Sequence, residues 1–447
     1  MPSIQYIIDL ETYNREDINS KTVQLKDGRN YTILNYNMNQ ESLNTLDDTS
    51  GKYRSVILSE SGKLLSFAPP KSINIDEFQN NYSIEDLSIV VNEVIEGTMI
   101  NLFFDAEKSI WEIATKASIG GNYWYFRNQY PCSDNHKRQE ETMSIPELTF
   151  RQMFVNALGM EDHDDLQDSN ILTNLDKKYC YSFILQHPSN HIVNRIIAPT
   201  IYLVAVYEIV ENTVKVVDPS EYEYWPNIYN SLIRVPKRFI NETYTDIKLQ
   251  KCSIDSTYDI PGVMFLNTAT GKRACMENEA YKKVRELRGN NPNLQFQYLS
   301  LKSQDKIGEF LIHFDQYTDL FGKFERQYDN FIRQVHNGYV NYYVKKTGNT
   351  VPKQYFPLVY KVHHEVFIPS VASGEKIIVK REVVADYINK IDPKSLIYYL
   401  NWKDENQKPN KRNKNEERDE EGDKENNQET IEEHTQHKDE EPESQVE

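Results

Sequence analysis

The sequence predicts an α+β protein built on antiparallel sheets, followed by a separate α-helical domain and a disordered acidic tail. Residues 1–300 mix short apolar runs with the alternation typical of strands, and from about residue 301 the apolar spacing becomes helical. Residues 403–447 have almost no apolar side chains. We therefore divide the 447-residue chain into domains 1–300, 301–402 and 403–447. A chain of this length can bury a stable core without disulfides or metals.

The strands of the first domain are predicted from apolar runs bounded by polar residues. The clearest of them are 55–58, 98–104, 201–206 and 262–266. A helix is predicted over 146–159, where Pro146 precedes apolar residues at helical spacing, and another over 277–288.

The helical domain is predicted from a change of period. Apolar residues recur at helical spacing over 307–314, 324–335, 354–368 and 381–400. We expect these ranges to form a helical domain that follows the first domain.

The acidic charge of the chain is concentrated in its tail. Residues 403–447 carry 8 Lys and Arg against 17 Asp and Glu, whereas residues 1–402 carry 43 against 51. So few apolar residues cannot offset the loss of chain entropy, which predicts a disordered tail. The tail is either a solvated extension or an arm that binds a protein partner. The body remains compatible with a phosphate-binding cleft, because local potential rather than net charge decides such binding.

Cysteine usage and hydropathy favour a cytoplasmic protein with no membrane partner. The four cysteines, at positions 132, 180, 252 and 275, have no short paired spacings, which predicts neither a disulfide framework nor a zinc site. No segment reaches the ~18 apolar residues of a membrane span, and the N-terminus lacks the basic flank of a secretory signal.

Residues 93–120 form the most informative segment. Glu96-Gly97 precedes a strand, a hairpin is expected at Asp105–Ser109, and the second strand ends at Lys116. An ordinary structural hairpin would give the same pattern.

In order and spacing, this segment resembles the nucleophile motif of the covalent nucleotidyltransferases, particularly the tRNA-repair type of phage RNA ligase and its relatives in large DNA viruses. That motif is lysine, any residue, aspartate, glycine, then serine or threonine. The matching positions here are Val94, Ile95, Glu96, Gly97 and Thr98. Valine therefore stands at the position of the nucleophile.

Further stretches follow in the family's order over roughly residues 50–300. Arg54 falls in a segment that resembles the upstream arginine-glycine strand, and Lys71 ends a proline-rich stretch similar to the family's. The segment 181–193 resembles the middle motif, with Ile184 and His191 at the positions of the usual glutamate and arginine.

The last two motifs lack their functional residues. Residues 259–265 resemble the glutamate-glycine motif that helps to place the metal and the nucleotide, with Pro261 at the glutamate position. Residues 271–281 resemble the final motif, whose lysine falls on Cys275.

Adenylyl transfer needs a deprotonated amine to attack the α-phosphorus of ATP, carboxylates to hold the metal, and a second lysine to stabilise the developing charge. Val94, Pro261 and Cys275 supply none of these groups. The resemblance thus implies a catalytically inactive protein, for which we predict no catalytic residue, metal site or cofactor. The candidates for nucleotide or phosphate binding are Arg54, Lys71, Glu96, Gly97 and Lys116.

Three functions remain open. The leading prediction is an inactive RNA ligase-like protein that binds RNA or a nucleotide, in the host cytoplasm or the virion of a large DNA virus. The second is an active ligase that uses ATP and Mg²⁺ with a displaced lysine, Lys71 or Lys116. The third is a structural or virion interaction protein.

Three other patterns are interpreted as structural. The acidic run 161–165 lacks the glycine turn of a Ca²⁺ loop, which favours a solvated loop. His363 and His364 are adjacent in a helical stretch and so would point in different directions. The aromatic run 123–126 beside Arg127 could stack on bases, but aromatic residues in strands usually fill the core.

Overall fold

The computed structural model describes residues 4–10, 16–37, 45, 49–123, 148–289, 291, 293–347 and 350–402. The chain divides into two compact units, one ending at Asn293 and the other beginning at Leu294. The first unit contains antiparallel sheets and the second is helical, which confirms the α+β prediction. The predicted tail, 403–447, lies outside the described residues.

Within the described residues, the largest sheet has seven strands in the order β1-β11-β10-β9-β7-β8, with β12 beside β10. Its neighbours are antiparallel except for the parallel pair of β10 and β12. The strands are β1 (Gln5–Ile7), β7 (Thr98–Asp105), β8 (Ile110–Ala114), β9 (Tyr179–Gln186), β10 (Thr200–Val210), β11 (Thr213–Val216) and β12 (Ile233–Arg234).

The other strands of the described residues form two smaller antiparallel sheets. The four-stranded sheet has the order β2-β3-β4-β5 and the three-stranded sheet has the order β14-β13-β6. Their strands are β2 (Ile18–Gln24), β3 (Asn30–Tyr36), β4 (Val56–Ser59), β5 (Leu64–Phe67), β6 (Ile89–Glu93), β13 (Gly262–Asn267) and β14 (Arg273–Glu277). The four predicted apolar runs thus correspond to β4, β7, β10 and β13.

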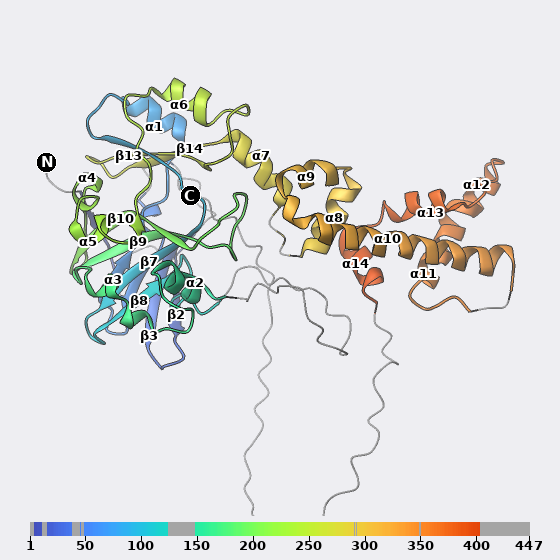
Figure 1. The fold of residues 1–447 in the computed structure, drawn as a ribbon, viewed down its shortest axis with the longest axis horizontal. Coiled ribbons are helices and arrows are strands. Elements are labelled where there is room, and N and C mark those ends of the chain that lie inside the picture. The colour runs from blue at the N-terminus through green and yellow to red at the C-terminus, as the bar shows by residue number, and fades with distance from the viewer. Residues whose placement is uncertain are drawn as a thin grey trace, which may run out of the picture. The chain divides into compact units, whose positions relative to one another are not determined.

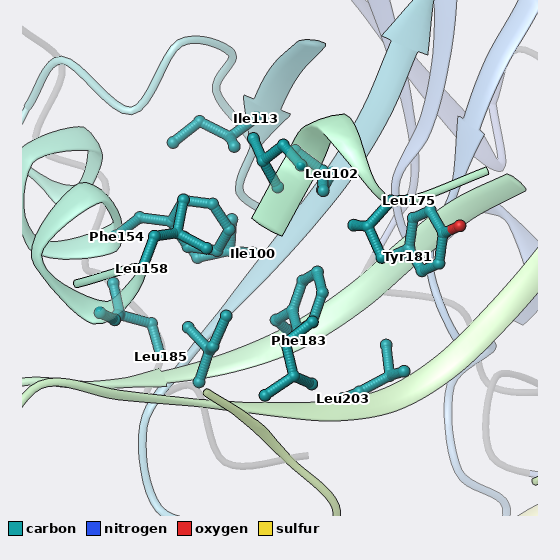
Figure 2. Close-up of a cluster of buried hydrophobic side chains, with 14 of the residues drawn as sticks. Ile100, Leu102, Ile113, Phe154, Leu158, Leu175, Tyr181, Phe183, Leu185 and Leu203 are labelled. Carbon is teal, nitrogen blue, oxygen red and sulfur yellow. The ribbon is translucent and has the colours of Figure 1, made fainter. Parts of the chain in front are cut away.

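The two faces of the large sheet are both buried because successive side chains of a strand point to opposite faces. One face packs against α2 (Phe150–Ala157), whose Phe154 lies among strand residues such as Ile100 and Phe183 (Figure 2). The other face carries Phe103, which packs with residues of the four-stranded sheet.

Helices close the remaining surfaces of the first unit. The helices α1 (Ile75–Asn81) and α6 (Tyr244–Lys251) pack on the three-stranded sheet (Figure 1). Shorter helices follow the strands at α3 (Asn170–Thr173), α4 (Pro219–Tyr222) and α5 (Pro226–Tyr229), with 3-10 turns at Gly51–Tyr53 and Leu166–Asp168.

Both helices predicted in this unit are present. The first begins at Phe150 rather than near Pro146, because Thr149 and Gln152 form a capping box that satisfies the first backbone N–H groups. Residues 146 and 147 lie outside the described part of the chain. The second is α7 (Glu279–Arg288), where Asn278 caps the N-terminus.

The second unit is organised around α10 (Thr318–Tyr339), a helix of 22 residues. This helix contacts α8, α11, α13 and α14. The α-helices of the second unit are α8 (Leu294–Ser303), α9 (Ile307–His313), α10, α11 (Phe356–Lys361), α12 (Ile368–Ala372), α13 (Arg381–Ile388) and α14 (Pro393–Leu400). The unit also has a 3-10 turn at Asp315–Tyr317. The predicted boundary at residue 300 falls inside α8, whose first residues, 294–298, alternate apolar and polar side chains as a strand does. None of the helices in the described ranges could cross a membrane.

Candidate nucleotide-binding site

The turn between β6 and β7 carries the nucleophile-like motif and joins the three-stranded sheet to the large sheet. The backbone N–H of Val94 donates to the carbonyl of Gly262 at 3.0 Å, which extends the pairing of β6 with β13. Val94 is therefore bonded to the residue that follows Pro261 in the sequence. Neither side chain carries an amine or a carboxylate.

Cys275 lies on the same sheet. It is directly opposite Met264 in the β13–β14 pair, and Met264 is opposite Asn92 of β6. Residues that face each other across antiparallel strands lie on one face of the sheet. The opposite face, with Val263 and Ala274, packs against α1 and α6. Cys275 thus occupies the face that those helices leave free, and it is partly exposed.

Glu96 is buried and its carboxylate is fully engaged. Oε1 accepts the backbone N–H groups of Ile192 at 2.8 Å and Val193 at 3.0 Å. Oε2 accepts the N–H of Asn194 at 2.9 Å and the hydroxyl of Tyr281 at 3.0 Å. A carboxylate has about four lone-pair sites, so these four donors saturate it. Glu96 joins the β9–β10 loop to α7 and has no oxygen left to bind a metal or a nucleotide.

The position of Gly97 has no room for a side chain. Its φ is +154°, and a Cβ at this position would lie 2.4 Å from the carbonyl oxygen of Leu185 and 2.7 Å from the Cγ2 of Ile184. Any side chain would therefore collide with the backbone of β9. The glycine lets the turn approach that strand closely.

Lys71 and Lys116 come from separate loops and meet at one aromatic ring. Their Nζ atoms lie 5.8 Å and 5.1 Å from the ring centroid of Tyr36, which is buried at the end of β3. Cations within about 6 Å of a ring centroid are attracted by its π system. Both lysine side chains are half-buried. We call Arg54, Lys71 and Lys116 around Tyr36 the Tyr36 region.

Arg54 and Lys116 lie on neighbouring segments of this region. The hydroxyl of Ser55 donates to the carbonyl of Thr115 at 3.4 Å, and each of these residues adjoins one of the cations. Both cations were expected on strands. Arg54 instead precedes β4, and Lys116 lies in the turn after β8. Arg54 is buried.

The Tyr36 region lies next to the degenerate motifs. The N–H of Ile73 donates to the carbonyl of Arg273 at 2.8 Å, and Ile73 forms a parallel bridge with Ala274, so the segment after Lys71 runs alongside β14 and Cys275. Ala114 pairs with Asn101 of β7, so Lys116 follows the end of β8 nearest the Glu96–Gly97 turn. The structure therefore brings Lys71 and Lys116 together at Tyr36, and Lys116 follows the end of the large sheet at which the Glu96–Gly97 turn lies.

Arg273 is a cation of this region that the sequence reasoning missed. Its Nε lies 3.4 Å from the hydroxyl of Ser72, and it shares the face of β14 with Cys275. Residues two apart on a strand point to the same side. That spacing from Cys275 could have identified Arg273.

Two other features noted in the sequence, Tyr123 and the acidic run 161–165, make contacts within the protein. Tyr123 is hydrogen-bonded to Thr115 and packs on Phe150, with ring centroids 5.2 Å apart, whereas residues 124–127 lie outside the described part of the chain. In the run 161–165, Asp164 accepts the N–H of Glu161 at 2.9 Å and shapes the loop. Across the described ranges, no group of three or more acidic, His or Cys residues could hold a metal ion.

Comparison with known proteins finds similarity to one viral protein and to two solved ligase structures. The chain is 23% identical over 287 residues to the immediate-early protein ICP-46 homolog of Invertebrate iridescent virus 6, covering 60% of this chain and 56% of the relative. The RNA ligase of Naegleria gruberi, solved with PPi, matches at 10% identity and a TM-score of 0.29, covering 44% of this chain and 51% of the ligase. A protein of Aquifex aeolicus named as an ATP-dependent DNA ligase matches at 12% identity and a TM-score of 0.37, covering 69% of this chain and 78% of that one.

Other solved forms of the Naegleria enzyme contain ATP and Mn. No family model matches the chain. The chain is thus similar, at low identity, to one protein of a large DNA virus and to nucleic-acid ligases, the class that its motifs resemble.

Proposed function

We propose that this chain is a catalytically inactive RNA ligase-like protein that binds the phosphates of RNA or of a nucleotide in the Tyr36 region. The convergence of Lys71 and Lys116 on one ring carries this proposal. Two ammonium groups from separate loops approach the same ring, which supports binding of one anion by both, and lysine binds phosphate as a compact point charge. Arg273 adds a further cation on the neighbouring strand.

The proposed inactivity rests on the chemistry of the side chains. Val94 has no amine to attack a phosphorus atom, and Cys275 lacks the positive charge of a lysine. Pro261 has no side-chain oxygen, and four donors occupy the carboxylate of Glu96. These residues do not fit a Mg²⁺ site, which needs oxygen ligands. We therefore derive no adenylyl-transfer step for this chain.

Binding across a salt series tests the proposal. Fluorescence anisotropy with labelled single-stranded RNA should give an affinity that falls as salt rises, because each phosphate contact contributes about 0.7 to the slope of log affinity against log salt. Replacing Lys71 and Lys116 together by glutamine should lower the slope by about 1.4. The control replaces Lys63 and Lys108, two exposed lysines of the same unit, by glutamine.

The competing functions predict different results. An unchanged slope in the Lys71/Lys116 variant would contradict phosphate binding in the Tyr36 region. Absence of RNA and ATP binding at low salt would favour the structural or virion role instead. We further propose a location in the host cytoplasm or in the virion, on the ground that the chain is similar to a viral protein.

A further inference from the structure

The second unit contains a long basic and aromatic segment in an otherwise acidic chain. Residues 330–364 include four lysines, one arginine and seven Phe or Tyr residues, with no Asp or Glu, although the chain has a net charge of −17. The segment covers the end of α10, the loop after it, and α11. Its composition combines the two groups that bind single-stranded nucleic acid, which are cations and aromatic rings.

Two π-helical turns organise this segment. They span Val340–Val344 and Val362–Phe367, and they bring Tyr343 onto His363 with ring centroids 3.6 Å apart and planes 9° apart. Single π-helical turns are rare and occur frequently at functional sites. Burial, followed by the neighbouring His364, lowers the pKa of His363.

The stack continues outward to exposed rings. Tyr342 contacts Tyr343 at 4.9 Å and Phe356 at 5.6 Å between ring centroids. Tyr360 stacks on His364 at 3.8 Å. Tyr342, Phe356 and Tyr360 remain 44%, 37% and 48% exposed. Leu358 and Val359, by contrast, are fully buried and supply the packing of α11. The rings of Tyr342, Phe356 and Tyr360 therefore lie outside the packed core.

Lysines lie close to the exposed rings in the sequence. Lys345 and Lys346 follow the first π-helical turn, and Lys361 follows Tyr360. All three are exposed, and none of them forms an ion pair with a residue in the described ranges. The next acidic residue, Glu365, accepts a hydrogen bond from the hydroxyl of Tyr387 at 2.6 Å. We call Tyr342, Phe356, Tyr360, Lys345, Lys346 and Lys361 the aromatic–lysine surface.

We propose that the aromatic–lysine surface binds single-stranded nucleic acid, with bases stacked on its rings and phosphates held by its lysines. Charge complementarity alone would also suit an acidic peptide. Three half-exposed rings beside the lysines favour a polyanion that has flat aromatic faces of its own. The inference uses residues of the second unit and does not depend on the Tyr36 region.

The rings are tested in the full-length chain with fluorescein-labelled oligouridylate. Replacing Tyr342 and Tyr360 together by leucine keeps apolar volume for packing and removes the ring faces. Since a stacked base contributes on the order of 1–3 kcal/mol, each lost stack should weaken binding by about 5- to 150-fold. The matched control replaces Tyr224 and Tyr229, which are 75% and 76% exposed, by leucine and should bind like the wild type.

The lysines are tested by the salt dependence of the same binding. Replacing Lys345, Lys346 and Lys361 by glutamine should lower the slope by about 2, and the control replaces Lys21, Lys63 and Lys108. A lysine effect without a tyrosine effect would assign the surface to acidic peptides and overturn the proposal. Loss of binding only in the Lys71/Lys116 variant would also overturn it, while leaving the proposed function of the Tyr36 region intact.

Discussion

The hydroxyl of Tyr281 donates a 3.0 Å hydrogen bond to the carboxylate of Glu96, although the two residues are 185 positions apart in the sequence. Both are buried. This bond ties α7 to the turn that carries the nucleophile-like motif, and the same carboxylate holds three backbone N–H groups of the β9–β10 loop. The negative charge of Glu96 therefore organises the backbone of this region.

Changes at these two residues should lower stability to different extents. Tyr281→Phe removes one hydrogen bond to a charged group and should cost about 2 kcal/mol. Glu96→Gln should cost more, about 3 kcal/mol, because the new amide NH₂ would face a backbone N–H. Urea unfolding measures both values, with the exposed Glu85→Gln as the control. Equal stability of Glu96→Gln and the wild type would contradict the assigned role.

Stability should also depend on His187 at acidic pH. Burial lowers the pKa of His187 from 6.5 to about 4, and its Nδ1 accepts the N–H of Ser189 at 3.0 Å. The unfolded chain therefore takes up a proton that the folded chain excludes, and stability falls as pH drops from about 6.5 towards 4. The slope should correspond to at most one proton.

The variant His187→Asn tests this pH dependence. Asparagine can still accept the N–H of Ser189 but does not titrate, so the unfolding free energy should lose part of its slope between these pH values. The control His163→Asn changes a histidine whose side chain is 80% exposed, and it measures the effect of removing a surface imidazole.

Incubation with ATP and Mg²⁺ should give no covalent AMP adduct, because Val94, at the position that resembles the nucleophile, has no amine. Val94→Lys alone should also fail, since Pro261 supplies no metal ligand and Cys275 no positive charge. Intact-protein mass spectrometry after denaturation is the measurement. An adduct in the wild type that disappears in Lys71→Ala or Lys116→Ala would instead identify an active ligase with a displaced lysine.

Truncation after Trp402 should leave the thermal unfolding midpoint unchanged. Trp402 contacts Tyr398 of α14, with ring centroids 5.3 Å apart, and the removed residues have almost no apolar side chains to bury. Differential scanning calorimetry makes the comparison. A drop of several degrees would mean that the tail packs on the folded units. If the tail competes for cations on the body, truncation should strengthen RNA binding at low salt.

Much of the fold could be predicted because the spacing of apolar residues along the sequence indicates the strands and helices. The apolar run at 98–104 became β7, and the change of period after residue 300 corresponded to a helical unit. The partners of Glu96 could not be predicted, because three of them are backbone N–H groups about a hundred positions away. Tyr36 was missed for the same reason: nothing local links it to Lys71.

The space around Gly97 has a consequence for finding distant relatives. A side chain there would meet the backbone of β9, so this glycine is needed whether or not the protein performs any chemistry. The same holds for the acidic residue before it, whose partners are internal. Proteins with this fold are therefore expected to keep the acidic-glycine pair, whatever residue stands at the position of Val94. A sequence profile weighted on the pair, together with a tyrosine at the start of the helix that contains Tyr281, should detect them where a search for catalytic residues fails.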